Sequence, residues 1–184
     1  MKKQILVVED DENDVFFLQK AIQRAGIEIP VHVASDGRKA LDYLDGAGAF
    51  ADREEFPLPT LVLLDLKLPQ VMGLDVLRWI RQRPDLRFPV IILSASANEA
   101  DIEAAYRLGA NAYLIKPGVA AKLLDMVRAI KDFWLTHNTS NDPHPTTHIQ
   151  RPTSNDPHST THIQRPTFQR PKKSLKRWFK ATSD

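Results

Sequence analysis

The feature of this sequence that most constrains its fold is a fivefold alternation of short apolar runs with one-sided helical patterns. The apolar runs are Gln4–Val8, Val31–Ala34, Thr60–Leu64, Val90–Leu93 and Ala112–Ile115. Each run has four or five residues and almost no polar alternation. Such runs are typical of strands that are covered on both faces, as in a parallel sheet. The sequence therefore predicts five buried parallel strands.

Apolar residues between these runs recur at steps of three and four residues, which predicts helices with one buried side. The pattern is clearest in Val15, Leu18, Ile22 and Ala25, and in Leu123, Val127, Ile130 and Trp134. Three further segments share it, namely Arg38–Leu44, Gly73–Arg81 and Glu99–Leu108. Gly26 and Gly109 stand where helices are expected to stop. Because right-handed crossovers place helices on both faces of a sheet, we expect a doubly wound α/β domain with a five-stranded parallel sheet.

Composition divides the chain of 184 residues into two parts. Residues 1–139 hold 17 Lys+Arg and 20 Asp+Glu, a net charge of −3, whereas residues 140–184 hold 8 and 3, a net charge of +5. The second part also has six of the thirteen prolines and none of the seven glycines. It cannot bury enough apolar surface to offset the entropy of ordering. We therefore expect a folded domain over residues 1–137 and a disordered C-terminal tail over residues 138–184.

The tail contains a direct repeat followed by a basic end. Residues 140–153 return as residues 154–167 with one change, Pro145 to Ser159. Each copy has a single isoleucine and cannot build a hydrophobic core. Its histidines lie in a Pro-rich segment that gives no fixed geometry for binding a metal ion. The last segment, Arg170–Lys180, combines cations with scattered apolar residues. Weak contact with an anionic membrane or another polyanion is one interpretation of this end, and a solvated basic end is the other.

Several classes of protein are excluded by what the sequence lacks. Without cysteine there is no disulfide and no thiolate site. No run approaches the roughly 18 apolar residues of a membrane span, and the apolar start Ile5–Val8 is too short for a secretory signal. We therefore expect a cytoplasmic protein. No helix-turn-helix or catalytic module follows residue 137, so sequence-specific DNA binding is not expected.

Polar side chains follow four of the five expected strands. Asp10 and Asp11 come after the first, Asp65 ends the third, Ser94 ends the fourth and Lys116 follows the fifth. In a sheet of order 2-1-3-4-5 these four strands are neighbours, so we expect the five side chains to share one shallow pocket. Three gathered carboxylates repel one another unless a cation lies among them. Ligation by oxygen alone suits Mg²⁺, with Mn²⁺ as the alternative.

A carboxylate, a divalent ion, a hydroxyl and a lysine together fit the acceptance of a phosphoryl group. The carboxylate attacks as the nucleophile and becomes an aspartyl phosphate, while the ion and the ammonium neutralise the charge on the equatorial oxygens. No Gly-x-x-x-x-Gly-Lys-Ser/Thr loop is present, so a nucleoside triphosphate is not the expected donor.

The same residues carry a resemblance to a known family. The ordered set Asp10-Asp11, Asp65-x-x-x-Pro69, Ser94-Ala95 and Tyr113-x-x-Lys116-Pro117 resembles the receiver domain of two-component response regulators. The resemblance covers residues 1 to about 137 and implies the CheY-like, flavodoxin-like sheet order 2-1-3-4-5. The long connection Gly46–Pro59 and the ending Phe133-Trp134-Leu135 resemble more specifically the single-domain regulators of bacterial phytochrome-type histidine kinases. The resemblance implies a phosphoprotein of a phosphorelay rather than an enzyme.

The resemblance also implies how the phosphoryl group and the ion are held. Asp65 would be the phosphoacceptor, taking the group from a phosphohistidine of a sensor histidine kinase. Asp11 and Asp65 would bind Mg²⁺ directly and Asp10 through water. Lys67 would add its backbone carbonyl. Glu9 is expected to lie beside the acidic pocket without binding the ion.

Three further residues would respond to phosphorylation. Lys116 would pair with Asp65 at rest and with a phosphoryl oxygen afterwards, and its bond to Pro117 would be cis. Ser94 would turn its hydroxyl to the phosphoryl group. Tyr113 would then move between outward and inward rotamers and report the change at the surface.

Each of these features has a plainer interpretation. Asp10 or Asp11 could cap the helix that begins near Asn13, and Lys116-Pro117 alone is typical of a turn. A phosphorylation-independent interaction scaffold with the same fold is the alternative function. A hydrolytic Mg²⁺ phosphatase comes third, because no cap domain or additional general acid is visible. The apolar cluster Phe133–Leu135 indicates either a homodimer contact or packing onto the core.

Overall fold

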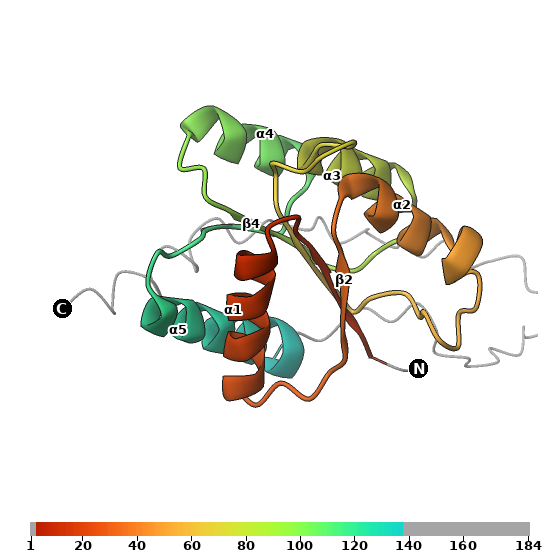
Figure 1. Ribbon diagram of the computed structural model, residues 1–184. Helices are drawn as coiled ribbons and strands as arrows, with labels where there is room; N and C mark the ends of the chain where they lie inside the picture. The colour runs from red at the N-terminus through yellow and green to blue at the C-terminus, as the bar shows by residue number, and fades with distance from the viewer. Residues whose placement is uncertain (1–2, 138–184) are drawn as a thin grey trace, which may run out of the picture. The chain divides into compact units, whose positions relative to one another are not determined.

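The computed structural model describes residues 3–137. Five strands alternate with five helices in this range (Figure 1). The strands are β1 Ile5–Val8, β2 Val31–Ala34, β3 Leu61–Leu64, β4 Val90–Ser94 and β5 Ala112–Ile115. The helices are α1 Glu12–Arg24, α2 Gly37–Asp45, α3 Gly73–Gln82, α4 Glu99–Leu108 and α5 Ala120–Ile130. The expected tail, with its repeat and basic end, lies outside the described residues, so the division at residue 137 stays a prediction.

The five strands form one parallel sheet in the order β2-β1-β3-β4-β5. Val7 of β1 lies between Val33 of β2 and Leu63 of β3, and every described strand pair is parallel. The chain therefore runs outward to one edge through β2 and to the other through β4 and β5. The expected doubly wound sheet of order 2-1-3-4-5 is confirmed.

Helices cover both faces of the sheet. Helices α1 and α5 lie on one face, and α2, α3 and α4 lie on the other (Figure 1). Side chains alternate between the faces along each strand. In β1, Leu6 and Val8 pack under α2 and α3, whereas Ile5 and Val7 pack under α1 and α5. All four side chains are buried, which is why the apolar runs show no polar alternation.

The helix stop signals lie where the sequence placed them. Gly109 follows α4 with a φ of 98°, and Gly26 follows the end of α1 with a φ of 66°. Both are left-handed conformations that glycine adopts without a steric penalty. The amide of Gly109 donates to the carbonyl of Tyr106, which satisfies an acceptor at the end of α4. These turns return the chain to the next strand.

The long connection after α2 folds back onto the edge of the sheet. Its Phe50 and Phe56 rings lie edge-to-face with the His32 ring of β2, at centroid distances of 5.5 and 5.7 Å. The Tyr43 hydroxyl donates to the carbonyl of Pro57 at 2.6 Å, and Arg53 donates to the carbonyl of Tyr43 at 2.7 Å. The aromatic side chains of this connection thus pack on α2 and β2.

The chain continues past α5 as a π-helical segment, Lys131–His137. Trp134 and Leu135 pack partly buried against the core that α1 and α5 cover, whereas Phe133 is 45% exposed. For Trp134 and Leu135 the core-packing interpretation is therefore the right one. None of the helices between residues 3 and 137 combines the length and the apolar character needed to cross a bilayer.

Candidate functional site

The carboxyl ends of the strands hold the candidate residues in register. The amide of Glu9 donates to Ala34 O of β2 at 3.0 Å, and the amide of Asp65 donates to Val8 O of β1 at 3.0 Å. Each bond extends the sheet ladder by one residue beyond the strand. Parallel strands end at the same edge of a sheet, so these residues meet although they are far apart in the chain.

Asp65 is the centre of the site. Its side chain is 9% exposed, and its Oδ2 accepts a hydrogen bond from Lys116 Nζ at 2.8 Å. Its Oδ1 accepts from the backbone amides of Leu66 and Lys67 at 2.5 and 3.3 Å. Each carboxylate oxygen therefore has a donor, and the side chain is fixed in one orientation. The Lys67 side chain points away from the core and is exposed.

Lys116 places a cation among the acidic groups. Its Nζ lies 2.5 Å from Glu9 Oε2, 2.7 Å from Asp14 Oδ2 and 2.8 Å from Asp65 Oδ2. Burial lowers the pKa of Lys116, but the hydrogen bonds to Asp14, Asp65 and Glu9 outweigh it and raise that pKa above its ordinary value. The ammonium is therefore charged at neutral pH.

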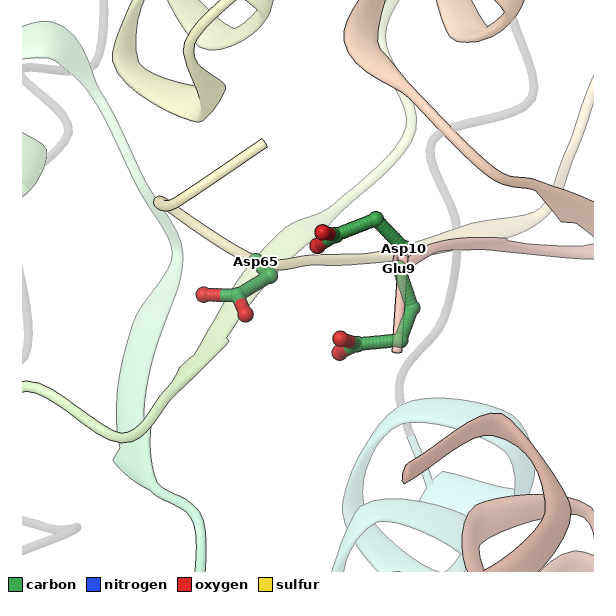
Figure 2. A group of neighbouring side chains, drawn as sticks. All are labelled: Glu9, Asp10 and Asp65. Carbon is green, nitrogen blue, oxygen red and sulfur yellow. The ribbon is translucent and has the colours of Figure 1, made fainter. Parts of the chain in front are cut away.

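Three carboxylates form a group that fits a divalent ion. One oxygen each of Glu9, Asp10 and Asp65 lie within 4.8 Å of one another. Figure 2 shows Glu9 and Asp10 directed from the end of β1 toward Asp65. Burial raises the pKa of Glu9, and this effect outweighs the lowering by Lys116. The donor set is all oxygen and Asp10 is exposed, which fits Mg²⁺ or Mn²⁺ with several retained waters.

Asp11 lies outside this group of three. It is the N-cap of α1, and its Oδ1 accepts from the amides of Asn13 and Asp14 at 2.8 and 3.1 Å. These bonds lower its pKa. The capping interpretation therefore holds for Asp11, and Glu9 occupies the place among the carboxylates that the sequence analysis gave to Asp11.

Ser94 is the last residue of β4, and Tyr113 is the second residue of the neighbouring strand β5. Ser94 is 1% exposed, and its Oγ accepts from the amide of Ser96 at 3.4 Å. The Tyr113 hydroxyl donates to the carbonyl of Ser96 at 2.9 Å, and burial raises the pKa of Tyr113. Both side chains thus contact the loop between β4 and α4, through which a change at Ser94 would reach Tyr113.

The expected cis bond between Lys116 and Pro117 is wrong. No peptide bond within residues 3–137 is cis, so this bond is trans. The trans isomer is the intrinsically favoured one even before proline, by about 0.5–1 kcal/mol. The amide of Lys116 donates to Ser94 O at 2.9 Å. From this backbone position its side chain donates to Glu9, Asp14 and Asp65.

The loop after β3 turns tightly beside Asp65. The amide of Gly73 donates to Leu66 O at 2.9 Å, which closes the loop. A Cβ at Gly73 would lie 2.0 Å from Asp65 O and 2.7 Å from Leu66 Cα. Only glycine permits this approach, so Gly73 sets the position of the backbone that carries Asp65.

Comparison with known proteins identifies the family. The family model for the response regulator receiver domain matches residues 5–128. The chain belongs to the receiver domain family of response regulators. Membership places it among signalling proteins rather than conventional enzymes, in a family that binds Mg²⁺ at an acidic pocket.

Individual relatives of this receiver domain support the narrower resemblance. Response regulator Rcp1 of Synechocystis sp. is 40% identical over 134 residues, which cover 72% of this chain and 89% of Rcp1. The crystal structure of its Mn²⁺-bound form has a TM-score of 0.68 and covers 74% of this chain and 97% of that one. The phosphorylated cyanobacterial phytochrome response regulator RcpA is 37% identical, with a TM-score of 0.70 and coverage of 76% and 98%. The expected likeness to regulators of the phytochrome type is confirmed.

Two residues of the site were not assigned to it from the sequence. Glu9 was expected to lie beside the acidic pocket without binding the ion, and Asp14 was given no role. The signal for Glu9 is its place directly after β1, because the first residue beyond a strand stays on the ladder. Asp14 gives no such signal, since its contact with Lys116 spans 102 positions of the chain.

Proposed function

We propose that this chain is a single-domain response regulator that accepts a phosphoryl group on Asp65 from a sensor histidine kinase. The observation that carries the proposal is the buried Asp65 carboxylate held between Lys116 and two backbone amides. An acid that served only to cap a turn would need no half-buried ammonium beside it. Regulated contacts with other proteins then carry the signal.

The reaction transfers the phosphoryl group from a histidine nitrogen of the kinase to a carboxylate oxygen of Asp65. A carboxylate oxygen of Asp65 attacks phosphorus, the P–N bond of the phosphohistidine breaks, and the imidazole leaves and takes a proton from solvent. Lys116 neutralises charge on the phosphoryl oxygens, because its ammonium already lies 2.8 Å from Asp65 Oδ2. Ser94 supplies a hydroxyl at the neighbouring strand end.

The ion site belongs to the same proposal. Asp10 and Asp65 would hold Mg²⁺, with Glu9 as the third carboxylate and the backbone carbonyl of Lys67 as a further ligand. The ion supplies positive charge that offsets the repulsion between the carboxylates and the incoming phosphoryl group. Because Asp11 caps α1, its assignment as a direct ligand has less support than that of Glu9.

Tyr113 is the proposed reporter of the phosphorylated state. Its hydroxyl is bonded to Ser96 O, in the loop that also contacts Ser94 Oγ. Movement of Ser94 toward a phosphoryl group would remove its bond with the Ser96 amide and release this loop. Tyr113 would then change rotamer beside β5, which is a local charge event acting on a two-state element.

The partner proposed here is a histidine kinase of the phytochrome type. It is supported by the likeness to RcpA, described as a cyanobacterial phytochrome response regulator. A homodimer is proposed with less support, since Trp134 and Leu135 pack on the core and only Phe133 of that cluster is exposed. Cytoplasmic location and weak membrane or polyanion contact of residues 170–180 stay predictions, and liposome co-sedimentation with and without the tail tests the last.

Phosphoryl transfer from a purified, phosphorylated histidine kinase tests the function. We expect the label to appear on the wild-type chain with Mg²⁺ and to be absent with EDTA or in Asp65→Asn. Labelling that persists in Asp65→Asn contradicts the proposal. A wild-type chain that stays unlabelled and yet binds its partner supports the alternative of a phosphorylation-independent scaffold.

A further inference from the structure

Lys116 contacts a third carboxylate that the phosphoryl transfer described above does not use. Asp14 Oδ2 lies 2.7 Å from Lys116 Nζ, closer than Asp65 Oδ2 at 2.8 Å. Asp14 lies in the first turn of α1, and its side chain is 48% exposed. It is therefore neither part of the core nor among the carboxylates that lie within reach of one ion.

The position of Asp14 is fixed by the helix on which it stands. Its amide donates to Asp11 Oδ1 at 3.1 Å, so the N-cap of α1 holds this turn in place. From this turn the Asp14 carboxylate reaches Lys116, the residue that follows β5. The N-cap therefore fixes the turn from which Asp14 reaches Lys116.

The three contacts use the full donor capacity of Lys116. An ammonium has three protons, and the oxygens of Glu9, Asp14 and Asp65 lie at 2.5, 2.7 and 2.8 Å from its nitrogen. An arriving phosphoryl oxygen must therefore displace one of these acceptors. Asp65 gives up Lys116 only once the phosphoryl group is attached, so during the approach of the donor one of the other two acids must move. Glu9 is 5% exposed in its side chain, so its Oε2 would lose its donor without gaining water, whereas Asp14 can turn into water.

We propose that Asp14 is a positioning residue that competes with the phosphoryl group for Lys116 and so slows phosphoryl acceptance at Asp65. The inference rests on the proposed function. Asp14 holds the ammonium toward α1 in the resting protein and releases it when the donor binds. The strength of this contact sets how readily Lys116 reaches the incoming group.

The test uses acetyl phosphate as a small donor for the full-length chain with Mg²⁺. Asp65 attacks phosphorus, the P–O bond to the acetyl group breaks and acetate leaves. We expect Asp14→Asn, which keeps the shape but removes the charge, to raise kcat/KM about two- to fivefold, as expected for loss of a half-exposed ion pair. Asp14→Glu, which keeps a carboxylate, should restore the wild-type value.

Glu12→Gln is the matched control. Glu12 is also acidic, exposed and in the first turn of α1, so its neutralisation changes the net charge and the helix dipole equally. We expect it to leave kcat/KM unchanged. A second readout in the resting protein is proton exchange at the Lys116 ammonium by NMR, which Asp14→Asn should accelerate and Glu12→Gln should not.

Two results overturn the inference about Asp14. The first is an Asp14→Asn rate equal to or below that of the wild type, and the second is an equal rise in Glu12→Gln. A wild-type chain that takes no phosphoryl group from either acetyl phosphate or a kinase removes the proposed function and this inference together. Failure of the inference alone is therefore distinguishable from failure of the function.

Discussion

Asp10 and Asp11 are neighbours in the chain but have different surroundings. Asp10 lies in the group of three carboxylates, whereas Asp11 caps α1. We expect Asp10→Ala to weaken Mg²⁺ binding by about tenfold or more, because it removes a proposed ligand. Asp11→Ala should keep the affinity within about twofold and instead lower the free energy of unfolding through loss of the cap.

Calorimetric Mg²⁺ titration of both variants checks the expected affinities, and urea denaturation checks the expected loss of stability. An Asp11→Ala protein that loses as much Mg²⁺ affinity as Asp10→Ala would restore the role that the sequence analysis gave to Asp11.

In the proposed reaction, Lys116 would oppose binding of the ion and assist the phosphoryl transfer. Its ammonium lies against Glu9 and Asp65, two of the three proposed carboxylate ligands. We expect Lys116→Met to bind Mg²⁺ about tenfold more tightly, because a competing cation is removed. It should accept the phosphoryl group about 100-fold more slowly, because the charge on the phosphoryl oxygens is no longer neutralised.

Fluorescence-monitored Mg²⁺ titration and acetyl phosphate labelling measure the two effects of Lys116→Met. Lys122→Met, at an exposed position of α5, controls for the loss of one positive charge. Weaker Mg²⁺ binding in Lys116→Met, or an equal effect in the control, contradicts the assigned role.

Among the elements, the turn between β3 and α3 has the tightest packing against the site. A methyl group at Gly73 would meet the Asp65 carbonyl at 2.0 Å, whereas one at Gly118 would meet nothing within 4 Å. We expect Gly73→Ala to lower the free energy of unfolding by about 1–3 kcal/mol and Gly118→Ala to change it little. Urea denaturation measures both. Equal stability of the two variants would show that the turn relaxes without cost.

We expect the element formed by α2 and its following connection to lose stability at alkaline pH. Burial raises the pKa of Tyr43 to about 12, from an ordinary value of 10.0. A group whose pKa is higher in the folded state than in the unfolded state loses its contribution as pH rises. Tyr43 therefore stabilises the fold fully below pH about 10, and this contribution disappears between about pH 10 and 12.

The Tyr43→Phe variant isolates this effect. We expect it to be less stable at neutral pH by about 1 kcal/mol, because the bond to Pro57 is lost, and to show a smaller decline of stability between pH 10 and 12. Urea midpoints across this range check it. A decline as steep as in the wild type would place the alkaline sensitivity on other groups, including Lys116.

The elements also show where sequence-based reasoning holds and where it stops. Strands such as β1 and β3 follow directly from their apolar runs, because burial on both faces leaves a local pattern. The packing of Phe50 and Phe56 on His32 leaves no such pattern, since an irregular connection has no period. Contacts set by tertiary structure cannot be read from spacing alone.

The site shows the same division. The strand-end positions of Asp65 and Lys116 could be predicted, because parallel strands end at one edge of the sheet. Which of Glu9 and Asp11 lies close to Asp10 and Asp65 could not, because it depends on the residue at which α1 begins. Asp11 is the N-cap of that helix, and its carboxylate bonds the amides of the first turn.

At the scale of the whole molecule, the doubly wound sheet brings an acid after β3 and an amine after β5 to one point. The fold is held by two cores, one on each face of the sheet, and the site lies at the edge between them. Phosphorylation there, as proposed, would change the charge near the loop after β4, which both Ser94 and Tyr113 contact. This placement would let a local reaction alter the surface near β5.

The most direct measurement is identification of the phosphorylated residue. The chain is treated with a phosphoryl donor and Mg²⁺, reduced with borohydride to convert an acyl phosphate to a stable alcohol, and mapped by mass spectrometry. The account predicts homoserine at position 65 and at no other acidic residue. A modified histidine or serine, or a reduced carboxylate at position 10 or 11 in place of 65, would contradict it.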